Sequence, residues 1–261
     1  MEQLTGLRHG ATPARPDQEF RASPVRSTGR QGRPSLISLN GRTLWNGLAL
    51  VALFLWVMHL IVVASLLADA PMPGRARFHL DVEGNLPTFF SSSILMLSAL
   101  FLALIAVVKN GEKDRFRFHW AVMALIFFLL SVDEAASFHE VLIEPLRRAG
   151  VGVAGYLRFP WVLAGSAFVM VFVYAYSRFL LALPRPVAGM FLLSGAVFVT
   201  GAIGFEMVGG SVFDETNMNT PEYLAAMTVE EILEMIGILL FIRTLLAYLR
   251  ASGASFSLRF S

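Results

Sequence analysis

Residues 44–67 read LWNGLALVALFLWVMHLIVVASLL, a run in which Asn46, His59 and Ser65 are the only polar side chains apart from the two tryptophans. A helix needs about 20 residues to cross the hydrocarbon core of a bilayer, and this run exceeds that length. It is also too long for the apolar region of a cleaved signal peptide. We therefore expect a membrane span that the mature protein retains.

Five further apolar stretches of similar length follow. The six predicted spans are Leu44–Leu67, Thr88–Val108, His119–Glu140, Trp161–Leu183, Val187–Glu206 and Glu222–Leu249. Of the 261 residues, 56% are hydrophobic and 15% are charged, whereas soluble domains carry roughly a quarter charged residues. The sequence thus predicts an all-α, polytopic integral membrane bundle of six transmembrane helices, with the lipid bilayer as its surroundings.

Basic residues gather in alternate connections. Residues 1–42 contain seven Arg, and residues 109–117 contain Lys109, Lys113, Arg115 and Arg117, whereas residues 207–221 contain no Lys or Arg. Short cytoplasmic loops carry an excess of Lys and Arg, so we expect both termini in the cytoplasm. Arg provides nearly all of the 21 basic residues, which favours a GC-rich bacterial genome and hence a bacterial inner membrane.

The sequence divides into three parts. Residues 1–42, rich in Arg and Pro, predict a disordered basic cytoplasmic tail. Residues 43–250 form the six-helix domain, and residues 251–261 a short cytoplasmic tail. The N-terminal tail has the charge for anionic lipid or nucleic acid, but Phe20 is its only aromatic residue. We interpret the tail as a topology anchor and expect no nucleic-acid partner.

Ionisable residues interrupt four of the spans at one depth. With both termini inside, they fall in the outer half of the membrane or at its outer surface. These candidate site residues are His59, Asp133, Glu134, His139, Glu206, Glu230, Glu231 and Glu234. In a continuous helix, Asp133 and Glu140 share one face and Glu230 and Glu234 share another. We expect Asp133, Glu230 and Glu234 to be central and the others to support them.

The free-energy cost of placing these acids in a membrane indicates that something must offset their charge. Membrane insertion costs about 2.5–3.5 kcal/mol for an acidic residue at the centre of a span, so several unpaired acids would cost more than roughly 10 kcal/mol. Few basic residues lie at that depth. Three arrangements would offset the cost: a bound metal ion, protonated carboxyl groups, or a water-filled cavity. Interhelical hydrogen bonding is the structural alternative, and His59 alone is typical of a buried histidine with satisfied nitrogens.

Two other features accompany these acids. His79, Asp81 and Glu83 alternate in the predicted outer connection before the second span, where they would complete a site or cap the bundle. The small residues of spans four and five predict a close approach of those two helices. They are Gly165, Ser166, Gly195, Ala196, Thr200, Gly201 and Gly204.

The sequence leaves three functional classes open. In a transporter, the carboxylates would bind a cation or protons and exchange them against a small solute. In a membrane metalloenzyme, they would hold a divalent metal ion as cofactor. A non-catalytic assembly subunit needs no site. Cysteine chemistry is excluded because the chain has no Cys, and no Glu stands three residues before His59 or His139, so the Glu-x-x-His pairs of di-iron bundles are absent.

Overall fold

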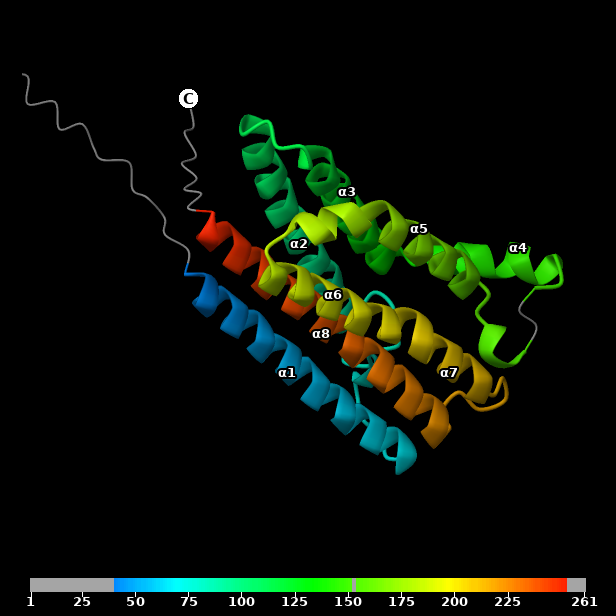
Figure 1. Cartoon of the computed structure of the whole chain (residues 1–261). Helices are drawn as coiled ribbons and strands as arrows, with labels where there is room; N and C mark the ends of the chain where they lie inside the picture. The colour runs from blue at the N-terminus through cyan, green and yellow to red at the C-terminus, as the bar shows by residue number, and fades with distance from the viewer. Residues whose placement is uncertain (1–39, 152–153, 253–261) are drawn as a thin grey trace, which may run out of the picture. The chain divides into compact units, whose positions relative to one another are not determined.

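The structure is a computed structural model that describes residues 40–151 and 154–252. Every regular element in that part of the chain is helical, as predicted (Figure 1). In chain order the elements are α1 (Gly41–Leu67), η1 (Arg75–Arg77), α2 (Leu86–Gly111), α3 (Arg117–Ala136), η2 (Phe138–Leu142), α4 (Ile143–Arg148), η3 (Gly155–Leu157), α5 (Trp161–Ala182), α6 (Arg185–Val199), η4 (Thr200–Phe205), α7 (Glu206–Val212) and α8 (Pro221–Ala251).

Six helices of the described residues are long and apolar enough to cross a membrane. They are Gly41–Leu67, Leu86–Gly111, Arg117–Ala136, Trp161–Ala182, Arg185–Val212 and Pro221–Ala251. The six predicted stretches are therefore confirmed as helices, with boundaries that move by a few residues. The predicted tails lie almost wholly outside the described residues, although α1 and α8 each take up a short part of them at Gly41–Arg42 and Ala251.

Capping side chains set several helix starts. Thr220 caps α8 by accepting a hydrogen bond from the N–H of Tyr223, and Pro221 occupies the first helical position, as the sequence predicts. Asn85 caps α2 in the same way through the N–H of Thr88. Each of these helices therefore has an acceptor for one of its first N–H groups, at the end where the polar side chains gather.

The third span ends earlier than predicted. α3 stops at Ala136, and Ser137 adopts a left-handed conformation with φ of 50° while its N–H donates to the carbonyl of Asp133. The chain then continues as η2 rather than as an α-helix. The predicted common face of Asp133 and Glu140 is consequently wrong, because it requires an unbroken helix through Glu140.

α8 lies at the centre of the bundle, in contact with α1, α2, α6, η4 and α7 (Figure 1). One apolar core joins α1, α2 and α8 around Leu55, Ile94 and Met235. A second, largely aromatic core joins α2, α3, α5, α6 and α8 around Trp120 and Phe241. The central position of α8 brings its three glutamates within reach of several other helices.

Close packing of the fifth span is directed at α8 rather than mainly at the fourth span. A Cβ at Gly201 would lie 2.7 Å from the carbonyl oxygen of Glu230, and one at Gly237 would lie 2.8 Å from the backbone of Phe198. Gly165 does face Ile203 of the fifth span, but Gly195 has no neighbour within 4 Å of its Cβ position. Among the glycines predicted to join spans four and five, Gly165 alone lies against the other span.

The fifth span is interrupted by a π-helical segment. η4, residues Thr200–Phe205, is π-helical and lies between α6 and α7. The Thr200 hydroxyl donates to the carbonyl of Ala196 at 2.7 Å and so satisfies one carbonyl near the interruption. Segments of this kind are rare and are frequent at functional sites. η4 comes directly before Glu206, the residue at which the sequence predicts the end of the fifth span.

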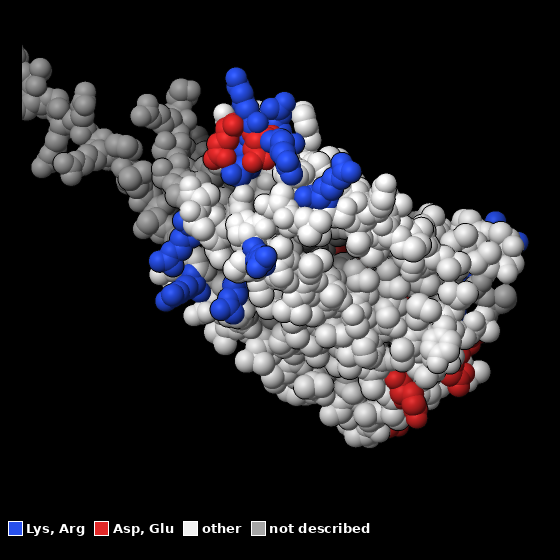
Figure 2. Space-filling model, viewed as in Figure 1, with Lys and Arg blue, Asp and Glu red and all other residues white. Residues whose placement is uncertain are grey.

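Charged residues separate towards the two ends of the helices. Figure 2 shows Lys and Arg gathered at the end where α1 begins and α8 finishes, with a second group of Asp and Glu at the opposite end. We call these the basic end and the acidic end. The basic end carries the α2–α3 and α5–α6 connections, and the acidic end carries residues 68–85, 137–151, 154–160 and 213–220.

Candidate functional site

The predicted acids converge towards the acidic end. The side chains of Glu206 and Glu230 lie close enough to interact directly, and Glu234 lies within electrostatic range of both Glu206 and Glu134. Glu231 interacts with Glu134 in the same way. We define the acid cluster as Asp81, Glu83, Asp133, Glu134, His139, Glu206, Glu230, Glu231 and Glu234. It contains seven of the eight residues predicted for the site, all but His59.

Asp133 and His139 form the one ion pair of the cluster within the described residues. Asp133 Oδ1 accepts a hydrogen bond from the backbone N–H of His139 at 2.8 Å, and Asp133 Oδ2 lies 3.0 Å from His139 Nδ1. Burial lowers the pKa of His139, but the hydrogen bond to Asp133 and the charges of Asp133 and Glu206 outweigh it, so the pKa is raised. Asp133 is thereby turned towards His139.

Trp161 connects this pair to the fifth span. Its indole N–H donates to Glu206 Oε1 at 2.7 Å, and its ring lies 4.9 Å from the ring of His139. Trp161 begins α5, so one side chain joins α5 to η2 and to α7. Sequence reasoning missed Trp161. Its position at the start of the span, close to the acids in depth, was the available signal.

Three glutamates of the cluster have no hydrogen-bond partner among the described residues. They are Glu134, Glu231 and Glu234, each half-buried, and their oxygens are absent from the fully enclosed, unsatisfied atoms of that region. These oxygens therefore keep some accessible surface. A carboxyl group inside a helical bundle needs hydrogen-bond partners, and the accessible space beside these groups is where water or a small cation can supply them.

The connection between α1 and α2 completes the cluster. The Tyr223 hydroxyl donates to Asp81, with O–O distances of 3.3 and 3.5 Å. Desolvation by the surrounding protein, together with the charges of Glu206 and Glu83, raises the pKa of Asp81 to about 7. Asp81 nevertheless keeps an exposed surface, which places it at the open rim. The sequence predicts that this connection completes a site or caps the bundle, but nothing in the sequence singles out Tyr223.

Glu83 belongs to the same rim. Burial and the charges of Glu140 and Asp133 raise its pKa, while a hydrogen bond with Ser137 and the charge of His139 act in the opposite direction. The residue is exposed. Two carboxyl groups of the connection, Asp81 and Glu83, thus stand at the exposed rim of the cluster at the acidic end.

His59 stands apart from the acids. It is fully buried, with its Nδ1 accepting from the N–H of Leu80 at 3.1 Å and its Nε2 2.9 Å from the hydroxyl of Thr228. Because Nδ1 accepts, Nε2 carries the proton and the ring is neutral. Both nitrogens are occupied, so His59 joins α1 to the connection and to α8 rather than serving as a ligand. The ring of His79 packs edge-on against it, with centroids 5.3 Å apart.

Neither a metal-ligand group nor a surplus of cations accompanies the acids. In residues 40–151 and 154–252, no group of three or more His, Asp or Glu side chains is arranged to hold a metal ion. The other ion pairs of this part of the chain lie outside the cluster and are Lys109–Glu112, Arg148–Glu144 and Arg158–Glu215. The charge imbalance that the sequence predicts therefore persists in the folded chain.

No curated protein and no solved structure matches the chain. Residues 43–249 match one family model, and they span all six helices. The chain therefore belongs to the family described as "Domain of unknown function (DUF8692)".

Proposed function

We propose that this chain is an integral membrane protein of the bacterial inner membrane, with six spans and both termini in the cytoplasm, whose acid cluster takes up and releases protons from the external side. This is the task of the carboxyl site in a proton-coupled transporter, where protons are exchanged against a small solute. The acidic end then faces outwards and the basic end faces the cytoplasm.

The contact between Glu206 and Glu230 carries this proposal. Two ionised carboxylates in contact repel each other strongly in a medium of low dielectric constant, whereas a pair that shares one proton makes a hydrogen bond. No Lys or Arg of the described residues forms an ion pair with either side chain. A proton shared between the two carboxyl groups is the simplest way to stabilise the pair. The release and rebinding of this proton would make the pair a proton-binding site.

The arrangement favours protons over a divalent metal. Divalent cations take several oxygen or nitrogen ligands around one point, and the described residues provide no such group. Two of the ligands proposed from the sequence already bond to other protein groups. His59 bonds to Leu80 and Thr228, and Asp133 bonds to His139.

Access is favoured from the acidic end. Asp81 and Glu83 are exposed there and stand at the rim of the cluster. On the side of the basic end, the aromatic core packs Trp120, Phe179 and Phe241 between the helices. A carrier in this state is open to one side and closed to the other, as alternating access requires.

Infrared difference spectroscopy on the reconstituted full-length protein tests the proposal. We expect a pH-dependent signal from a protonated carboxyl group that Glu230→Gln or Glu206→Gln removes. Glu222→Gln is the matched control, because Glu222 is an exposed glutamate at the start of the same helix. The proposal fails if the wild-type protein shows no titrating carboxyl signal, or if the control removes the signal equally. It also fails if one divalent ion stabilises the wild-type protein but not Glu230→Gln.

A further inference from the structure

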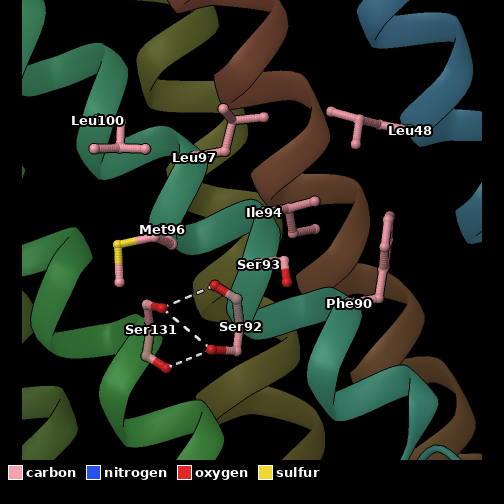
Figure 3. Close-up of a pocket in the computed structure, with 9 residues that line it drawn as sticks. All are labelled: Leu48, Phe90, Ser92, Ser93, Ile94, Met96, Leu97, Leu100 and Ser131. Carbon is pink, nitrogen blue, oxygen red and sulfur yellow. Dashed lines mark hydrogen bonds between the residues drawn. The ribbon is translucent and has the colours of Figure 1, made fainter.

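A groove runs along the surface of α2. It has a volume of about 450 Å³, and most of its lining comes from α2, with Leu48 from α1 and Ser131 from α3. Figure 3 shows Leu48 and Phe90 on one side of it, and Met96 and Leu100 on the other. Ser93 lies between them and is exposed. We call this hollow the α2 groove.

A second hollow lies at the acidic end of the same helix. It has a volume of about 420 Å³ and is lined by the connection before α2 and by the first residue of that helix. The residues that matter here are Arg77, Glu83, Asn85 and Leu86. We call it the headgroup recess. In the described part of the chain, neither Arg77 nor Glu83 belongs to an ion pair.

The two hollows follow one face of α2. Leu86 lines the headgroup recess, and Phe90, Ser93, Leu97 and Leu100 line the α2 groove. Their spacings of four, three, four and three residues place them on a single helical stripe. The stripe therefore leads from a pocket with one cation and one anion at the acidic end to an apolar groove in the membrane-spanning part of the helix.

The headgroup recess is held in place by Asn85. Its Nδ2 donates to the carbonyls of Ala76 at 2.9 Å and His79 at 2.6 Å, and its Oδ1 accepts from the N–H of Thr88 at 3.2 Å. One side chain thus fixes the end of η1 against the start of α2. Arg77, next to Ala76, is positioned by a folded connection rather than by a free loop.

We propose that the α2 groove and the headgroup recess together bind one phospholipid with a zwitterionic amine headgroup, such as phosphatidylethanolamine. Arg77 faces the phosphate and Glu83 faces the ammonium group, while an acyl chain lies against Phe90, Ser93 and Leu97. Charge complementarity selects this occupant. A purely anionic headgroup would meet the carboxylate of Glu83 without a compensating charge, and a neutral glyceride would leave Arg77 unpaired.

The small side chain at position 93 provides the test of the groove. The Ser93 hydroxyl donates to the carbonyl of Phe89 within its own helix, so Ser93→Phe fills the groove without breaking a bond between helices. Ser177→Phe is the matched control, because Ser177 is an exposed α5 residue whose hydroxyl also bonds to its own helix, at Tyr174.

Thermal unfolding of the full chain in detergent, with added lipid, measures the binding. For the wild-type protein we expect phosphatidylethanolamine to raise the melting temperature by about 3–6 °C at roughly ten times its dissociation constant. Phosphatidylglycerol, which lacks the amine, should raise it less, and diacylglycerol, which lacks the phosphate, should raise it least. Ser93→Phe should abolish the increase, and Ser177→Phe should retain it.

Two exposed recess residues keep the proposal testable even if Ser93→Phe folds poorly. Arg77→Gln should reduce the increase with both phospholipids, and Glu83→Gln should remove the preference for phosphatidylethanolamine over phosphatidylglycerol. Equal increases with all three lipids overturn the proposal, because they indicate only general solvation. A preference for phosphatidylglycerol in the wild-type protein, or an unchanged response in Arg77→Gln, overturns it as well.

Discussion

His139 and Asp133 are joined twice, once through the backbone N–H of His139 and once through its ring nitrogen, at 2.8 and 3.0 Å. The double contact follows directly from the left-handed turn at Ser137, which ends α3 and brings the chain back over its last turn. One carboxylate therefore both terminates a helix and fixes the histidine that lies beside Trp161.

The pair predicts a pH dependence of stability. The pKa of His139 is raised in the folded protein, so its contribution is fully present below the unfolded pKa of about 6.5 and is lost as pH rises through the folded value. His139→Gln should lower the free energy of unfolding by about 1–3 kcal/mol near pH 6, and by less at higher pH. Unfolding of both proteins across this range measures the effect. A difference that grows with pH would contradict the assignment.

Asp81 predicts a pH effect in a lower window. Its pKa is raised to about 7 in the folded protein, so folding favours the protonated carboxyl, and stability from this residue falls as pH rises from about 4 to about 7. Asp81→Asn should therefore be more stable than the wild-type protein above about pH 7 and similar to it near pH 4. Melting temperatures of both proteins, with Glu222→Gln as control, measure the difference. If Asp81→Asn is instead less stable than the wild-type protein at high pH, the hydrogen bond from Tyr223 to Asp81 outweighs the effect of the raised pKa.

Gly201 predicts a steric limit on the fifth span. A methyl group there would lie 2.7 Å from the carbonyl oxygen of Glu230, so Gly201→Ala should cost about 1–3 kcal/mol by overpacking. Gly195→Ala is the control, because its Cβ position has no neighbour within 4 Å. It should be neutral or gain up to about 1 kcal/mol from helix propensity. Chemical denaturation measures the free energy of unfolding of both variants. Equal changes would mean that the fifth span and α8 lie farther apart than they do in the structure.

His59 predicts a structural rather than a ligand role. His59→Leu leaves the N–H of Leu80 without its acceptor, and an unsatisfied buried N–H costs about 1–3 kcal/mol. The Thr228 hydroxyl also loses His59 but keeps its bond to the carbonyl of Leu224. The variant should be clearly destabilised and yet keep the carboxyl infrared signal expected for the Glu206–Glu230 pair. Loss of that signal in a folded His59→Leu protein would bring His59 into the site.

The orientation of the bundle is tested by reporter fusions. We expect a fusion after Lys113, in the α2–α3 connection at the basic end, to report the cytoplasm. A fusion after Asn219, in the connection before α8, should report the external side. The same side for both would contradict the count of spans between them, and exchanged sides would reverse the direction from which the acid cluster is reached.

Much of the fold could be predicted because apolar length is a strong signal. A helix that is long enough to span a membrane can be recognised from about 20 apolar residues, whatever its neighbours are. The common level of the acids along the bundle could be predicted for the same reason, since it follows from the alternating direction of consecutive helices. Thus the sequence predicts that Glu206 and Glu230, from different helices, lie at one level.

Partners were harder to predict than depth. Which face of a helix meets which neighbour depends on the packing of all six helices, and Gly201 meets α8 although it had been assigned to a contact between spans four and five. Departures from the regular helix were also invisible. The early end of α3 depends on one left-handed residue, Ser137, and because of that residue the periodicity argument for Asp133 and Glu140 fails. Tyr223 and Trp161 carry no charge at neutral pH, so they do not stand out among the charged residues of the sequence.

The π-helical turn before Glu206 gives the acid pair an unusual dependence on the main chain. Such a turn holds one residue more than an α-helical turn, so the helix beyond it is rotated by about 100° from the course of an uninterrupted α-helix. Removing one residue from Thr200–Phe205 would leave Glu206 in the sequence but turn it away from Trp161 and Glu230. The register of backbone hydrogen bonding, rather than the identity of any side chain, therefore selects the two carboxyl groups that meet.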